Sequence, residues 1–245
     1  MISAELERTY PLKNGKVHIV FIGNAPWLYS ESHSDENLSD NNFQEQYKII
    51  FDRFPIKKLL YLDQVHDNQV ISAEQTIQPI TLMGKADALI TTEKLTALLI
   101  RTADCIPILG FHETTETIMA VHAGWRGLHK KIVSNALLSA HFANGKNQNQ
   151  SLETAQWKFH VGPFIATEHY EVQSDMLDHF SAEKFLRHDS KIYLDLKSIL
   201  MAEFSALHIN SSHIDWSDID TYKNPHWFSA RNGHTKRNFA LIWRS

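Results

Sequence analysis

The chain has 245 residues, of which 43% are hydrophobic and 21% charged, so it is long enough to bury a large core. Its formal net charge is −4 and its lysines and arginines are scattered, so nothing in the sequence indicates a nucleic-acid or anionic-membrane surface, and we expect neither partner. The single cysteine excludes an intrachain disulfide, and no apolar run reaches the roughly 18 residues that a membrane span needs. The polar first segment does not resemble a signal peptide, so we expect a cytoplasmic protein.

The first half of the chain predicts strands around one helix. Residues 17–22 predict a strand, and the polar residues 30–42 predict a loop. Apolar residues from Phe43 to Phe54 then repeat at helical spacing, which predicts a helix that Pro55 ends. Short apolar runs follow and are typical of a meander or mixed sheet. The strands predicted from these runs are 58–62, 69–72, 87–91, 96–101, 105–111 and 117–123.

The second half predicts further helices and strands. Residues 126–142 have a helical apolar pattern, and the polar residues 143–156 predict a surface loop. Because strands and helices do not alternate strictly, we expect an α+β fold, and we expect a single domain over residues 1–245. The remaining predicted elements are strands at 157–161, 191–195, 226–230 and 238–243 and helices at 168–180 and 196–209.

Several common catalytic motifs are absent from the sequence. There is no glycine-rich dinucleotide or P-loop motif, no HExxH and no GxSxG. The segment "HYE" at 169–171 imitates the H-x-E of zinc deaminases, but one cysteine cannot supply their cysteine pair. Nucleotide-dependent kinases, Rossmann dehydrogenases and α/β-hydrolases are therefore excluded.

The densest group of reactive residues lies around the only cysteine. Cys105 begins the predicted strand "CIPILGF", and His122 is near the end of the next predicted strand, "TIMAVHA". If the two strands form an antiparallel hairpin, Cys105 and His122 are neighbours at one sheet edge. A lone cysteine is most often a small buried hydrophobe, but this position also suits a nucleophile that His122 activates.

A third candidate is His66 in "LDQVHDNQV", between two predicted strands. By itself, a histidine in a loop is usually a solvated polar residue. Together with Cys105 and His122, it would complete a three-ligand zinc site with an open fourth position. Bound zinc lowers the pKa of its water to about 7. The neighbouring Asp63 and Asp104 would then orient the ligands or transfer protons.

The segments "QVH", "ADALIT", "TADCIPIL" and "VHAGWRGL", in this order, resemble the YfiH family, also called laccase-domain proteins or purine nucleoside phosphorylases. The resemblance runs from about Leu59 to the C-terminus and implies a four-layer α/β/β/α sandwich with mixed sheets. It also implies a zinc site at His66, Cys105 and His122. The implied activities are phosphorolysis of adenosine, inosine, guanosine and methylthioadenosine, and deamination of adenosine. Copper-dependent oxidation of phenols and editing of peptidoglycan precursors are further family labels.

The chain departs from the family pattern outside the expected metal ligands. "FIGNAPWLYSES" lacks the arginine of the family's N-terminal Thr-Arg-x-Gly-Gly-x-Ser element, and "GPFIAT" replaces its usual glycine-proline segment at Ala166 and Thr167. Asp220 stands where a cysteine is usual, and Asn232 where an arginine is usual. These departures concern the expected surroundings of the substrate.

Candidate substrate residues follow from charge and position. Arg126 opens a predicted helix, where backbone N–H groups favour anions, so it is a candidate for phosphate or ribose. Ser229, Arg231 and Arg237 match the family's terminal block, and paired arginines bind phosphate well. We take Arg126, Ser229 and Arg237 as the substrate-binding set. Trp125 and Trp227 are candidates for stacking on a purine, although core packing is the commoner role of tryptophan.

Three functions remain open from the sequence. The first is a zinc enzyme acting on purine nucleosides and phosphate, with copper as the alternative metal. The second is a metal-free Cys/His amide hydrolase, and the third is a metal-binding protein without catalysis. Metal content separates them, since about one zinc per chain favours the first or third and its absence favours the second.

Overall fold

The computed structural model describes residues 4–29, 43–73 and 76–245, so the loop predicted at 30–42 lies outside the described residues. The described chain is a mixed α/β protein with two six-stranded mixed sheets, a small three-stranded sheet and four α-helices. No described helix is long and apolar enough to cross a membrane.

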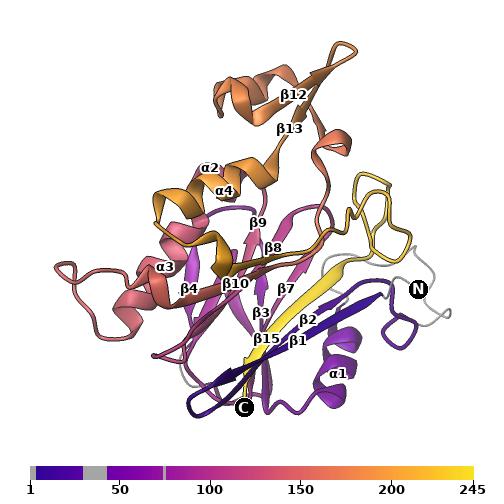
Figure 1. The fold of residues 1–245 in the computed structure, drawn as a ribbon. Helices are drawn as coiled ribbons and strands as arrows, with labels where there is room; N and C mark the ends of the chain where they lie inside the picture. The colour runs from indigo at the N-terminus through magenta and orange to yellow at the C-terminus, as the bar shows by residue number, and fades with distance from the viewer. Residues whose placement is uncertain (1–3, 30–42, 74–75) are drawn as a thin grey trace.

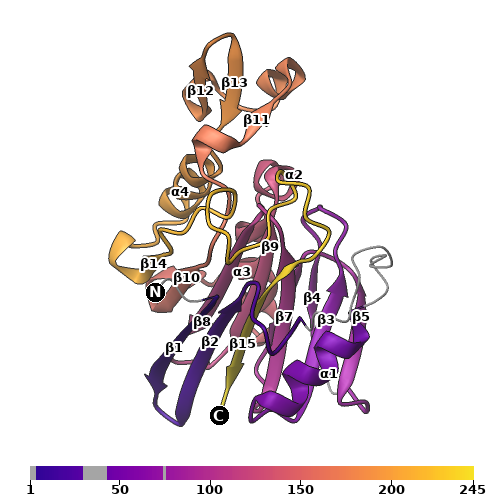
Figure 2. The same cartoon turned by 90° about the vertical axis from the view of Figure 1, so that its right-hand side faces the viewer.

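The first large sheet has the strand order β1-β2-β15-β7-β3-β5 (Figure 2). β1, β2, β15 and β7 pair antiparallel, and β3 pairs parallel with both β7 and β5. The strands are β1 (Glu5–Leu12), β2 (Gly15–Ile22), β3 (Lys58–Asp63), β5 (Ile80–Lys85), β7 (Thr96–Thr102) and β15 (Asn238–Arg244).

The second large sheet has the order β14-β10-β8-β9-β6-β4, and its centre is the antiparallel pair β8 and β9. The small sheet, β11-β13-β12, projects from the body of the protein at the top of Figures 1 and 2. The strands of the second sheet are β4 (Val70–Ser72), β6 (Ala88–Thr91), β8 (Ile106–His112), β9 (Ile118–Ala123), β10 (Trp157–Val161) and β14 (Ile214–Trp216). Those of the small sheet are β11 (Glu171–Val172), β12 (Phe185–His188) and β13 (Lys191–Leu194).

Three apolar clusters hold the sheets and helices together. One lies between the two large sheets, with Leu98 and Ile100 on the inner face of β7. Ala97 and Leu99 point to the opposite face of β7 and pack with helix α1, as the two-residue period of a strand requires. The third cluster joins the outer face of the second sheet to the other helices. The helices are α1 (Gln44–Arg53), α2 (Trp125–His129), α3 (Ile132–Ala143) and α4 (Leu196–Ala206).

Most of the predicted strands are present, together with the helices that became α1 and α4. β1, β5, β12 and β14 were not predicted. The helix predicted at 126–142 is wrong as one element, because Lys131 adopts a left-handed φ of 60° and separates α2 from α3. The predicted loop at 143–156 contains the last residue of α3, a mostly exposed connection and a short 3-10 helix, Thr154–Gln156.

Two further predicted elements are wrong. Residues 168–180 form two 3-10 turns and strand β11 rather than one helix. Residues 226–230 form no strand, because the side-chain amide of Asn238 takes the place of a partner strand. It accepts from the Phe228 N–H and donates to the Phe228 carbonyl, both at 2.8 Å.

Glu203 joins two helices of the outer layer and allows a test of their packing. Its carboxylate accepts hydrogen bonds from the N–H (2.9 Å) and the hydroxyl (2.8 Å) of Ser134, which connects α4 to α3. Burial raises the pKa of Glu203 above its ordinary value, even though these bonds oppose the shift. The folded state therefore disfavours the charged form, and this carboxyl contributes less stability as the pH rises from the ordinary glutamate pKa through the raised one.

We expect Glu203→Gln to change stability in a pH-dependent way. The amide oxygen can keep both bonds to Ser134 without a buried charge. The variant should therefore gain stability relative to wild type as the pH rises from the ordinary glutamate pKa through the raised pKa of Glu203. Thermal unfolding at several pH values measures this difference, with about 2–4 °C expected per kcal/mol for a chain of this size. Asp52→Asn on the partly exposed side of α1 is the control. A Glu203→Gln minus wild-type difference that stays constant with pH would contradict the expectation.

Candidate metal centre

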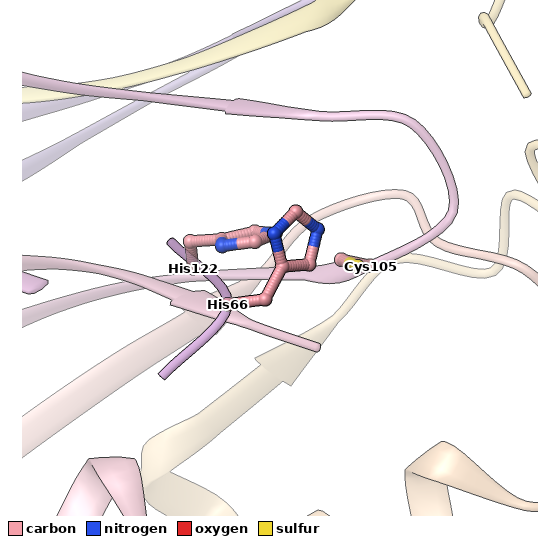
Figure 3. A group of neighbouring side chains, drawn as sticks. All are labelled: His66, Cys105 and His122. Atoms are coloured by element: carbon pink, nitrogen blue, oxygen red, sulfur yellow. The ribbon is translucent and has the colours of Figure 1, made fainter. Parts of the chain in front are cut away.

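His66, Cys105 and His122 converge at one end of the sheets (Figure 3). His66 lies in the loop after β3, Cys105 directly precedes β8, and His122 is in β9. One ligand atom from each side chain lies within 4.8 Å of the others, and the two imidazole rings meet edge to face at 4.7 Å. Among the described residues, this is the one group of three or more His, Cys, Asp or Glu side chains close enough to hold a metal ion.

The β8–β9 hairpin brings Cys105 to His122, as the sequence predicted. Ile106 pairs with Ala123 and Pro107 with His122, so the start of β8 lies beside the end of β9. All residues of both strands are buried, which explains why both segments read as continuous apolar runs. The position of Cys105 beside His122, at the ends of these two central strands, is thus a consequence of the hairpin register.

Asp87 positions the side chains of His66 and His122. Its fully buried carboxylate accepts backbone N–H bonds from Val65 (3.3 Å), His66 (3.0 Å) and Asp67 (2.7 Å). These bonds hold the loop in which His66 adopts a left-handed φ of 57°. The same carboxylate lies 2.7 Å from Nδ1 of His122, so Nδ1 donates to it and Nε2 is left for the cluster.

The three side chains and Asp87 shift one another's ionisation. Burial opposes ionisation of Cys105, but the charge of His122 and hydrogen bonds to His122 and His66 lower the pKa of the thiol to about 6. Burial also opposes protonation of His122, but the Cys105 charge and the bond to Asp87 raise the pKa of the imidazole to about 9. At neutral pH the metal-free protein therefore holds a thiolate beside an imidazolium.

Gly124 leaves room for the cluster. A Cβ atom at this position would lie 3.1 Å from Sγ of Cys105 and 3.4 Å from Cδ2 of His66. The backbone thus approaches the thiol more closely than a side chain would comfortably allow, which gives a steric reason for the glycine after "VHA".

A cavity of about 170 Å³ opens beside the cluster. Gln64 and Arg101, which both line it, were not among the candidate site residues of the sequence analysis. The signal that could have found Arg101 is its position: a charged side chain four residues before Cys105, in an otherwise apolar strand. The cavity is lined by Asp63, Gln64, His66, Arg101, Thr102, Ala103, Cys105, His122, Ala230 and Arg237.

The predicted substrate residues occupy three different environments. Arg237 lines the cavity. Ser229 is fully buried, and its hydroxyl accepts from the N–H of Asn232, so it holds a turn. Arg126 is exposed outside the cavity lining, with its guanidinium 4.4 Å from the ring centroid of Trp125. Trp227 is 1% exposed and packs in the cluster between the two large sheets.

The two aspartates that the sequence analysis named as neighbours of the ligands, Asp63 and Asp104, also lie in different environments. Asp63 lines the cavity. Asp104 is buried and accepts from the Thr221 hydroxyl and the Arg231 N–H, both at 2.8 Å, so its carboxylate fixes the loop before β15.

Two of the departures from the expected family pattern, Ala166 and Asp220, contact each other, and Asn232 contacts Tyr222. The N–H of Ala166 donates to Asp220 at 3.1 Å, and the side-chain amide of Asn232 donates to the carbonyl of Tyr222. Ala166, Thr167, Asp220 and Asn232 do not line the cavity beside the cluster.

Comparison with known proteins gives a consistent result. The family model described as "Multi-copper polyphenol oxidoreductase laccase" matches residues 30–245. A purine nucleoside phosphorylase of Rickettsia prowazekii is 30% identical over 210 residues, which cover 82% of each chain. One of Campylobacter jejuni is 26% identical over 187 residues, covering 76% of this chain and 77% of the relative.

Solved structures show the same fold. A Neisseria meningitidis protein superposes with a TM-score of 0.77 at 20% identity, covering 99% of this chain and 100% of that one. The YfiH protein of Bacillus licheniformis gives a TM-score of 0.78 at 19% identity, covering 94% and 93%. The expected resemblance is confirmed: the chain belongs to the YfiH family, the family of the multi-copper polyphenol oxidoreductase laccase model.

Proposed function

We propose that this protein is a zinc-dependent enzyme of purine nucleosides. It would cleave adenosine, inosine, guanosine and methylthioadenosine with phosphate, giving the free base and ribose 1-phosphate or its methylthio form. It would also deaminate adenosine. The observation that carries the proposal is the His66–Cys105–His122 cluster beside a cavity, in a chain whose relatives are named purine nucleoside phosphorylases.

The donor set suits zinc. Catalytic zinc sites use three protein ligands, drawn from histidine nitrogen, cysteine sulfur and carboxylate oxygen, and keep one position open. The bond from His122 to Asp87 is the carboxylate–histidine contact that commonly orients such ligands. When bound, zinc would supply a Lewis acid and lower the pKa of a water to about 7.

The reactions assign roles to the protein's own residues. Phosphorolysis breaks the bond between C1′ and the base, forms a bond from C1′ to a phosphate oxygen, and leaves the base to take up a proton. Deamination replaces the amino group at C6 with oxygen from water and releases ammonia. We assign proton transfer to Asp63 and a substrate contact to Arg237, both of which line the cavity. Arg126 would contact the substrate from outside the cavity lining. Ser229 would support the substrate contacts by holding the loop before Arg237.

The positions of the apolar clusters also support a proposal about the layers of the fold and the number of domains. We propose one domain built as a four-layer α/β/β/α sandwich, because an apolar cluster lies between the two large sheets and another covers each outer face.

Metal and product analysis test the proposed function together. Elemental analysis of the purified protein should find about one zinc per chain. Adenosine without phosphate should give inosine, and inosine with phosphate should give hypoxanthine and ribose 1-phosphate. Copper in the protein with oxidation of phenols would favour the oxidase activity named in the family description instead.

A metal-free Cys/His amide hydrolase, acting on peptidoglycan precursors, is the second candidate. The thiolate–imidazolium pair favours it, because an activated cysteine needs a lowered pKa and an adjacent base. Hydrolysis of an amide by protein with no metal would support this candidate.

The thiolate itself can be titrated. In protein stripped of metal, alkylation of Cys105 by iodoacetamide should fall with a midpoint near pH 6 as the thiol is protonated, whereas an ordinary cysteine has a pKa of about 8.5. His122→Asn should move the midpoint upward, because it removes the principal charge that stabilises the thiolate. A wild-type midpoint above pH 8 would contradict the pairing.

A further inference from the structure

A second cavity, of about 250 Å³, opens at the edges of the two large sheets. Residues of β1 line it from the first sheet and residues of β8, β10 and β14 from the second, and β1 and β14 are terminal strands on the same side of the molecule (Figure 2). Phe111 in its wall is six residues after Cys105 along β8, which is roughly 20 Å in an extended strand. The second cavity is therefore separate from the metal cluster.

Aromatic rings form much of the wall of this cavity. The rings of Tyr10 and Phe111 lie 5.2 Å apart between centroids and are tilted by 36°, and Phe159 on β10 adds a third ring. Aromatic rings pack favourably on one another in offset or edge-to-face contacts. The wall thus favours a flat aromatic ligand.

His160 supplies a polar group within these rings. It is 4% exposed, and its Nδ1 lies 3.1 Å from Oδ2 of Asp215, to which the hydroxyl of Tyr10 also donates at 3.5 Å. An ionised carboxylate only accepts hydrogen bonds, so Nδ1 carries a proton and donates. Burial lowers the pKa of His160 below its ordinary value, although the charge of Asp215 opposes the shift. At neutral pH the ring therefore has one proton, and its Nε2 is an acceptor.

Two ring nitrogens at this cavity have no hydrogen-bond partner among the described residues. They are Nε2 of His160 and the buried Nδ1 of His213. The ring of His160 also packs on Phe21, with 5.2 Å between centroids, which holds its orientation. Because a buried polar atom without a partner is unfavourable, a ligand that donates to Nε2 would supply a bond that the protein lacks.

The charges and the size of the cavity limit the ligand further. Lys158 lies 4.0 Å from Glu113, and Asp215 faces His160, so each charged side chain of the lining already has a partner. This arrangement favours a neutral ligand over an ion. Pockets for drug-sized molecules usually measure about 300–1,000 Å³, so a cavity of about 250 Å³ suits one or two rings.

We propose that this cavity is a second ligand site, which binds a small neutral aromatic molecule of one or two rings through an N–H or O–H group that donates to Nε2 of His160. The site goes beyond the proposed function, because its lining residues differ from those of the cavity beside the metal cluster. Its occupation can be measured without any reaction.

The first experiment uses indole as the probe, because indole has two fused rings, no charge and one N–H donor. Calorimetry measures its binding to the wild type and compares it with 1-methylindole, which has the same rings without the N–H. Loss of one neutral hydrogen bond should raise the dissociation constant about tenfold. The ¹⁵N resonance of Nε2 of His160 should shift with indole and stay in place with 1-methylindole.

The second experiment changes the acceptor. His160→Phe keeps a ring against Phe21 and removes Nε2, so it should bind indole about tenfold more weakly, and the difference between indole and 1-methylindole should disappear. His160→Gln keeps an acceptor near the position of Nε2 and should restore part of the affinity. His188→Phe, an exposed histidine on β12, is the matched control and should bind indole as the wild type does. Circular dichroism checks that each variant is folded.

Each outcome supports or overturns the second site. Wild-type protein that does not bind indole, or His160→Phe that binds it as tightly as wild type, would overturn it. If His160→Phe does not fold, equal affinity of the wild type for indole and 1-methylindole, with no shift of Nε2, would overturn it as well. Indole binding should persist in Cys105→Ser, whatever becomes of the proposed activity, and its loss there would mean that the ring binds at the metal cluster instead.

Discussion

The Cys105→Ser variant is expected to lose bound metal and activity while it keeps its fold. A serine hydroxyl is a poor zinc ligand compared with a thiolate, so the cluster would retain two imidazoles only. A bound metal contributes several kcal/mol to transition-state stabilisation, so both activities should fall by roughly a thousandfold or more. Elemental analysis and product formation from adenosine and inosine measure the two losses.

The fold should survive because Cys105 is half-buried at the start of β8, outside the three apolar clusters. His66→Asn should lose metal and activity in the same way. His188→Asn changes an exposed histidine on β12 and should alter neither. If Cys105→Ser keeps its metal and still loses activity, the cysteine acts as a nucleophile, and full deamination by metal-free Cys105→Ser would remove zinc from the mechanism.

The part of the site that depends on local pairing could be predicted from the sequence. Cys105 and His122 belong to two consecutive apolar runs, and such runs form a hairpin whose register then follows from the short connection between them. The family motifs added His66. They did not explain how a histidine in an exposed loop is held in place.

The elements that the sequence analysis missed depend on contacts distant in the chain. β11 is two residues long and is formed by pairing with β13, some twenty residues later. This pairing is not visible in the local sequence, where the pattern of apolar residues at 168–180 imitates that of a helix. β1 carries an alternation of Leu6, Tyr10 and Leu12 toward the cluster between the sheets, but the charged residues among them hid the pattern. The left-handed turn at Lys131 interrupts an apolar repeat that continues on both sides.

Arg101 and Asp87 are residues of the site that the sequence analysis missed for the same reason: their contacts are with residues distant in the chain. Arg101 is a charged residue in a mostly apolar strand, and the β7–β15 pairing brings it to the same cavity as Arg237. Asp87 precedes a fully buried strand and is itself 0% exposed. A carboxylate is almost never fully buried unless partnered, so its position before "ALIT" was the available signal. Its partners, 20 to 35 residues away, were not readable from the sequence.

Asp87→Asn should weaken metal binding and destabilise the protein at once. The carboxylate Oδ1 accepts from His122 and from the His66 N–H, and Oδ2 accepts from the Val65 and Asp67 N–H groups. An asparagine has one acceptor oxygen, so its NH₂ group must face donors on one side. Either the tautomer of His122 or the loop of His66 then loses its support.

The expected size follows from the two roles of Asp87. Loss of a carboxylate that orients a histidine ligand lowers metal affinity by about 10- to 100-fold. Leaving buried N–H groups without an acceptor lowers the free energy of unfolding by roughly 1–3 kcal/mol. Competition with a chelator measures the affinity, and denaturant unfolding of metal-free protein measures the stability separately.

Asp215→Asn is the matched control for Asp87→Asn. Asp215 also faces a histidine, His160, at 3.1 Å, but its side chain is 52% exposed and it does not line the cavity beside the cluster. Water can therefore replace what this substitution removes, and neither metal affinity nor stability should change much. Unchanged metal affinity in Asp87→Asn would mean that the neighbouring backbone alone fixes His66 and His122. A loss of affinity in Asp87→Asn alone would show that the cluster depends on this buried carboxylate as well as on its three ligands.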